Sequence, residues 1–119
     1  MDVSQLPVFR KMYDLNILII HLVDKFQKLY KYSIGEEMIK TSLGLFKHLI
    51  SANRDVENRV SHLDKFLDGF DLLKVYIRLV NENKMISLKE EAKLALITES
   101  ISKQIIGWKK KSKDATSDL

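Results

Sequence analysis

Hydrophobic residues recur at every third or fourth position along most of the chain, and this spacing is typical of one face of an α-helix. The pattern predicts four helices, over residues 8–30, 34–53 and 56–81 and from residue 88 into a C-terminal group of lysines. No segment alternates with the two-residue period of a β-strand. The connections are short, and short connections place successive helices side by side in opposite directions. We therefore expect an all-α fold, an antiparallel up-down-up-down four-helix bundle.

Side chains that cap helices mark three of the predicted helix starts. Ser33 and Glu36 form a capping-box pattern, in which the hydroxyl and the carboxylate each accept a backbone N–H from the other residue. Ser87 and Glu90 repeat this pattern before the fourth helix. Asp55 is the expected N-cap of the third helix, because Asp is favoured at that position.

Two features of the pattern predict contacts beyond those of a regular helix. Gly44 lies in the middle of the second helix, where glycine costs about 1 kcal/mol relative to alanine, and this predicts close packing of another helix. In the first helix, Ile17 and Ile20 widen the apolar face well beyond one stripe. Such a helix needs more than one neighbour, either as a fully internal helix of a monomer or in contact with other subunits. We favour a homo-oligomer, because a four-helix monomer leaves one side of each helix exposed.

The composition fits one small helical domain. The chain has 119 residues and no cysteine, which excludes disulfides and thiolate sites and suits a reducing, cytoplasmic compartment. The most apolar run, residues 17–23, is interrupted by His21 and is too short to cross a bilayer, so we expect no membrane association. We assign residues 1–112 to the bundle and residues 113–119 to a short flexible tail.

Catalytic, metal and cofactor chemistry has little support. The three histidines, His21, His48 and His62, fall on different predicted helices. No glutamate precedes a histidine at the Glu-x-x-His spacing of di-iron bundles. Acidic pairs at helix starts are explained by the helix dipole. We therefore expect a protein that is not an enzyme and that holds no metal or cofactor.

The basic residues are the better candidates for function, at a formal net charge of +4. Lys74 and Arg78 are four residues apart, so they share one face of the third helix and could contact phosphates. Their alternative role is an ordinary solvated face with local ion pairs such as that of Lys74 with Asp71. Trp108 suits a core or interface anchor better than a base-stacking platform. Further cationic residues could extend the phosphate-binding patch: Arg59, Lys103, Lys109, Lys110 and Lys111.

Short motifs along residues 8–110 resemble a known family. They are YDL at 13–15, KF at 25–26, YSIGEEM at 32–38, AN at 52–53, LK at 73–74, RL at 78–79, ISLK at 86–89 and GWK at 107–109. Their order and spacing resemble the small bacterial four-helix bundles that include the proteins of ribosomal-RNA intervening sequences and the accessory variability determinant (Avd) of diversity-generating retroelements. The Gly107-Trp108 ending favours the Avd branch.

The resemblance implies a function that composition and periodicity do not. Avd-like proteins are homopentamers that bind nucleic acid and associate with the reverse transcriptase in mutagenic retrohoming. RNA or DNA and a reverse transcriptase are therefore the expected partners, and phosphate contact becomes the favoured role of Lys74 and Arg78. The alternative is an intervening-sequence-type bundle, which would be a binding or structural module with a partner still to be identified.

Overall fold

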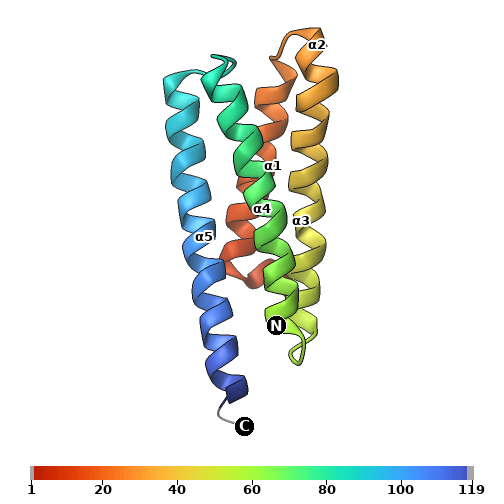
Figure 1. Ribbon diagram of the computed structural model, residues 1–119, viewed down its shortest axis with the longest axis vertical. Coiled ribbons are helices and arrows are strands. Elements are labelled where there is room, and N and C mark those ends of the chain that lie inside the picture. The colour runs from red at the N-terminus through yellow and green to blue at the C-terminus, as the bar shows by residue number, and fades with distance from the viewer. Residues whose placement is uncertain (1, 118–119) are drawn as a thin grey trace.

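The computed structural model describes residues 2–117, and every regular element in this range is helical. The long helices lie side by side along the long axis of a molecule that measures 53 × 22 × 22 Å, as Figure 1 shows. Residues 2–117 contain no strand, so the all-α class is confirmed. The long helices are α1 (Pro7–Asp24), α3 (Glu36–Arg54), α4 (Arg59–Glu82) and α5 (Leu88–Ser117), and the short elements are the 3-10 turn η1 (Val3–Gln5), α2 (Lys28–Tyr30) and the π-helical segment η2 (Lys31–Gly35).

The hydrophobic core lies between the long helices. α1 packs against α3 and α5, and α4 packs against the same two helices. The rings of Phe66 and Phe70 stack with their centroids 5.5 Å apart. Each large apolar side chain that is fully removed from water contributes roughly 1.5–3 kcal/mol. The largest fully buried side chains are Phe66, Phe70, Met12, Leu15, Ile19, Met38, Leu45, Leu49, Leu63, Leu73, Leu94 and Ile101.

The first helix ends earlier than the hydrophobic pattern predicted. α1 ends at Asp24, whereas we expected helix to Tyr30. The backbone N–H of Phe26 bonds the carbonyl oxygen of Val23 at 3.0 Å, which closes a tight turn. The Phe26 side chain is buried at this turn. The hydrophobic period therefore continues through the turn, and periodicity alone does not reveal the break.

The capping box predicted for Ser33 and Glu36 is wrong. Ser33 lies inside η2, and its hydroxyl donates to the carbonyl oxygen of Leu29 at 2.7 Å. Because helical structure has already begun in α2, no helix starts at this point that Ser33 could cap. Helical backbone instead continues through Gly35, where an added Cβ would stand 2.6 Å from Cγ1 of Val23. The absence of a side chain at Gly35 lets the chain approach α1 closely.

The other two predicted caps have different outcomes. The Ser87–Glu90 capping box is confirmed: the Ser87 N–H donates to Oε1 of Glu90 at 2.8 Å, and the Glu90 N–H donates to the Ser87 hydroxyl at 3.1 Å. The prediction for Asp55 is wrong by about one turn, because α4 begins at Arg59 and Asn58 is its N-cap residue. Asp55 accepts the backbone N–H of Asn58 at 3.3 Å and so holds the turn before the helix.

Close helix packing occurs at a different glycine from the one we predicted. A Cβ added to Gly44 would meet no atom within 4 Å, so the expectation of close packing there is wrong. At Gly69 on α4, an added Cβ would stand 2.8 Å from Cδ2 of Leu45 on α3. Gly69 therefore marks the close approach of these two helices.

α5 continues beyond the predicted end of the bundle. It extends to Ser117 and so includes residues 113–117 of the expected tail, while residues 118–119 lie outside the described part of the chain. None of the helices within residues 2–117 combines the length and the apolar character that a membrane span requires.

Candidate nucleic-acid interface

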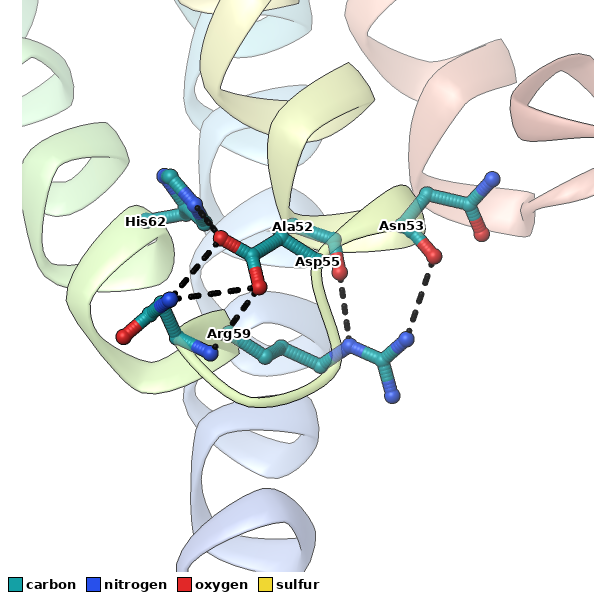
Figure 2. A network of polar contacts seen from close by, with 6 residues as sticks. Ala52, Asn53, Asp55, Arg59 and His62 are labelled. Atoms are coloured by element: carbon teal, nitrogen blue, oxygen red, sulfur yellow. Dashed lines mark hydrogen bonds and ion pairs between the residues drawn. The ribbon is translucent and has the colours of Figure 1, made fainter.

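The turn between α3 and α4 fixes Arg59, the first of the predicted cationic site residues. Its Nε donates to the carbonyl oxygen of Ala52 at 2.6 Å, and its Nη2 donates to that of Asn53 at 3.2 Å. Figure 2 shows the side chain reaching across the turn to both carbonyl groups. These carbonyls belong to the last turn of α3, where C=O groups lack partners within the helix. Arg59 therefore closes the end of α3 with a positive charge, which the helix dipole favours.

Asp55 holds the same turn from the other side. In Figure 2 its carboxylate faces away from the Arg59 guanidinium, toward His62. The His62 Nε2 lies 2.9 Å from Oδ2 of Asp55. Hydrogen bonds from His62 and then Asn58 hold the pKa of Asp55 below its ordinary value. The turn is thus bonded on both sides, which keeps Arg59 in one place.

Arg59 in turn supports the aromatic ring of Trp108 on α5. The guanidinium carbon lies 5.3 Å from the centroid of the indole ring, a cation–π distance. The neighbouring Lys109 joins the same two helices, since its Nζ lies 2.5 Å from Oδ1 of Asp64 on α4. Two predicted site residues therefore bind α4 to α5 at this end of the bundle.

A pocket of about 390 Å³ opens beside Trp108, between α5 and the start of α1. No carboxylate is among its lining residues, and two lysines are. α1 has no acidic residue in its first turn and no side-chain cap, so its positive dipole end adds to the positive potential here. We call this the Trp108 pocket, and it is lined by Leu6, Pro7, Val8, Lys103, Gln104, Gly107, Trp108 and Lys111.

The remaining cations of this end are exposed. Lys103 forms a surface ion pair with Glu99 at 3.1 Å, in which both side chains are mostly exposed. Lys110 and Lys111 form no ion pair within residues 2–117. No acidic residue occurs between residues 100 and 113. Arg59 contacts Trp108, Lys103 and Lys111 line its pocket, and Lys109 and Lys110 follow it along α5. We call these five of the seven predicted site residues, together with Trp108, the basic end.

The structure places Lys74 and Arg78 elsewhere. Both line a separate groove of about 300 Å³ between α4 and α5. Each forms a local ion pair, Lys74 with Asp71 at 3.3 Å and Arg78 with Glu82 at 2.7 Å. Glu91 also lines this groove, so its charge is mixed. The two residues share a face, as their spacing indicates, but they are not continuous with the Trp108 pocket.

Sequence reasoning missed a line of cations on α3. Lys40, Lys47 and Arg54 follow one another at seven-residue intervals, so they lie along one side of the helix, and none forms an ion pair within residues 2–117. α3 carries no acidic residue after Glu37. The seven-residue spacing of these cations in the sequence could have revealed them, because seven residues make about two helical turns. We call these three residues the α3 stripe.

His48 lies on α3 beside the stripe and close to further cations. Burial lowers the pKa of His48, and the charges of Lys47 and Lys65 lower it further. His48 is therefore neutral over a wider pH range than a solvated histidine. Among the described residues, no group of three or more His, Asp or Glu side chains is placed to hold a metal ion.

Comparison with known proteins gives the family. A model of the family described as bAvd-like matches residues 7–112, which include α1, α3, α4, most of α5 and every residue of the basic end. The chain belongs to the bAvd-like family. The family is one of non-catalytic accessory proteins of diversity-generating retroelements. No curated protein and no solved structure shows a significant match to the chain.

Proposed function

We propose that this bAvd-like protein is a non-catalytic accessory protein that binds RNA or DNA through its basic residues and associates with a reverse transcriptase during mutagenic retrohoming. Family membership over residues 7–112 supports the proposal. The subunit would be an antiparallel up-down-up-down bundle, since Figure 1 traces the chain alternately along the long axis. It would act in the cytoplasm as a homo-oligomer, a pentamer.

The observation that carries nucleic-acid binding is the basic end. Lysine and arginine bind phosphates by displacing condensed counterions, so clustered cations gain more than scattered ones. Here Lys110 and Lys111 are unpaired within the described residues, and Lys103 has only an exposed ion pair. α5 carries no acidic residue between positions 100 and 113. Asp64 pairs with Lys109 and Glu99 with Lys103, which leaves Lys110 and Lys111 for a polyanion.

The groove that holds Lys74 and Arg78 supplies a second contact. Their ion pairs with Asp71 and Glu82 are exposed, and exposed ion pairs contribute about 0–1 kcal/mol. A phosphate group can therefore displace the carboxylates at little cost. This supports a role for Lys74 and Arg78 as peripheral phosphate contacts.

Exposed apolar side chains on α1 support self-association. Tyr13, Ile17 and Ile20 are 47%, 41% and 38% exposed and lie within two turns of one another. Leu43 and Ile50 on α3, which packs against α1, are also partly exposed. Contact of Phe9 with Phe46 joins the two helices on this side, with their ring centroids 5.3 Å apart. Burial of this face against sister subunits would remove the apolar surface from water.

Salt titration of nucleic-acid binding tests the proposal. We expect the double variants Lys110→Glu with Lys111→Glu, and Lys74→Glu with Arg78→Glu, to weaken binding. Each should also flatten the salt dependence, by roughly one unit of slope for each phosphate group that the variant no longer binds. Circular dichroism and light scattering should show unchanged helicity and assembly size.

A matched control is Lys89→Glu with Lys93→Glu, a pair four residues apart at the other end of α5. We expect the control to have a smaller effect than either test variant. An equal loss of affinity in the two test variants and the control would show that binding responds to net charge alone. It would refute the basic end as the binding surface. Failure of the unaltered protein to bind RNA or DNA at low ionic strength would refute the proposed function.

A further inference from the structure

The Trp108 pocket contains more than phosphate binding requires. Beside its lysines it presents the apolar side chains of Leu6, Pro7 and Val8 and the indole of Trp108. We propose that the pocket holds one unpaired base of a single-stranded RNA or DNA, stacked on the Trp108 ring. The proposal rests on the nucleic-acid binding proposed above and adds to it a contact with a base.

The walls of the pocket suit a flat aromatic group. Its volume of about 390 Å³ is in the range of small-molecule sites, which combine apolar walls with a few polar groups. Trp108 packs against the hydrophobic core but is not fully buried, and the part that lines the pocket is accessible. Every base has a π-face, and stacking on an aromatic side chain is tolerant of sequence.

The charges around the pocket match a nucleotide. Lys103 and Lys111 both line it, and no carboxylate does. A base seated on the indole would bring its flanking phosphates to the rim, within reach of these two flexible cations. A phosphate alone would make no contact with the apolar walls. An apolar side chain of another protein would make no ion pair with the lysines. A nucleotide can contact the apolar walls with its base and the lysines with its phosphates.

Contacts with Arg59 fix the position of the Trp108 ring before any base binds. Arg59 lies over the indole at 5.3 Å and is itself fixed by hydrogen bonds to the carbonyls of Ala52 and Asn53. Arg59 therefore acts as a positioning residue for Trp108, and little further ordering is needed when a base binds. The indole N–H forms no hydrogen bond within residues 2–117, so stacking on the ring breaks no existing hydrogen bond of Trp108.

Tryptophan fluorescence measures this contact directly, because Trp108 is the single tryptophan of the chain. The full chain is titrated at low ionic strength with a short single-stranded oligonucleotide and, separately, with an abasic strand of the same length. A fluorescent label on each strand reports total binding by anisotropy. We expect the base-containing strand to quench Trp108 fluorescence strongly and to bind roughly 5- to 100-fold more tightly than the abasic strand.

Two variants separate the pocket from the rest of the surface. Trp108→Leu removes the ring, and it should bring the affinity for the base-containing strand down to that for the abasic strand. Gly107→Leu keeps the ring and adds a bulky side chain at a residue that lines the pocket, where an added Cβ meets no atom within 4 Å. We expect it to weaken binding of the base-containing strand selectively. This second variant also improves helix propensity, so loss of folding would not explain its effect.

The chain offers a matched control in Gly44→Leu. An added Cβ there also meets no atom within 4 Å, but Gly44 lies on α3, outside the pocket. We expect Gly44→Leu to keep the preference for the base-containing strand that the unaltered protein shows. Equal quenching and equal affinity for the two strands would overturn the base-binding proposal and leave phosphate binding intact. Absence of any binding to the labelled strands would refute both.

Discussion

At the scale of single residues, Arg59 shows how a cation of the basic end also serves the fold. Its Nε and Nη2 donate to backbone carbonyls at the end of α3, and its guanidinium lies over Trp108. Because Nε and Nη2 already donate to these carbonyls, only the remaining N–H groups of the guanidinium can bond a phosphate. The main effect of Arg59 on nucleic-acid binding should therefore pass through the position of Trp108.

Replacing Arg59 with lysine tests this structural role. A lysine carries the same charge but cannot reproduce the planar fork that reaches two carbonyls. We expect the free energy of unfolding to fall by about 1.5–3 kcal/mol, because the variant lacks these hydrogen bonds from a charged donor. Urea denaturation followed by circular dichroism measures the change.

Arg54→Lys is the control for this substitution. Arg54 is exposed on α3 and forms no ion pair within residues 2–117. Its replacement should change stability by less than about 0.5 kcal/mol. Equal effects of the two substitutions would contradict the structural role of Arg59.

Residue contacts could be predicted from the sequence only where they are local. The pairing of Lys74 with Asp71 follows from a spacing of three residues on a helix, and the structure contains it. The contact of Arg59 with Trp108 joins α4 to α5, and no local spacing encodes it. The Trp108 pocket depends on that contact and on the start of α1, so the pocket could not be predicted, although two of its lining residues, Lys103 and Lys111, were predicted as phosphate contacts.

At the scale of elements, Glu90 joins the start of α5 to the end of α1. Its Oε1 accepts the Ser87 N–H, and its Oε2 lies 2.5 Å from Nζ of Lys25. The hydrogen bond from Lys25, followed by that from the Ser87 backbone, holds the pKa of Glu90 below its ordinary value of 4.5. A lowered pKa in the folded state stabilises the fold above that ordinary value, and the contribution disappears as the pH falls through the folded pKa.

The variant Glu90→Gln should show this pH dependence. Glutamine keeps the capping hydrogen bond but removes the ion pair, so we expect a decrease in stability of about 0.5–1 kcal/mol at neutral pH. The difference from the unaltered protein should narrow as the pH falls below about 4.5. Urea denaturation at a series of pH values measures it. Glu91→Gln, whose carboxylate has no ion pair within the described residues, should leave the profile unchanged.

Helix starts and breaks were predictable to different degrees for physical reasons. The Ser87–Glu90 capping box is a local signal that agrees with the break in hydrophobic spacing, and it is confirmed. The same pattern at Ser33 failed because α2 and η2 already provide helical backbone there. The actual turn before α2 depends on the burial of Phe26, which is a tertiary contact.

At the scale of the whole molecule, exposed apolar side chains occur on all four long helices. The basic end is built from α4 and α5, and the apolar face proposed for self-association lies on α1 and α3, while Leu72, Val75 and Leu79 expose a further apolar row on α4. The hydrophobic pattern predicted the bundle because each helix must bury one stripe. It also predicted the excess apolar surface of α1, but not that α3 would continue it. Association through the α1 and α3 face would leave the basic end on α4 and α5 uncovered.

Ile17→Glu tests that arrangement. Ile17 is 41% exposed, so a charge there is tolerated by the subunit but would be buried without a partner in an assembly, which is strongly unfavourable. We expect light scattering to show a shift from oligomer to monomer, with helicity retained and with weaker nucleic-acid binding because a monomer has no multivalency. Leu96→Glu on α5, at 70% exposed, should leave the mass unchanged. A monomeric unaltered protein, or an assembly that survives Ile17→Glu, would show that this face of α1 is not the subunit contact.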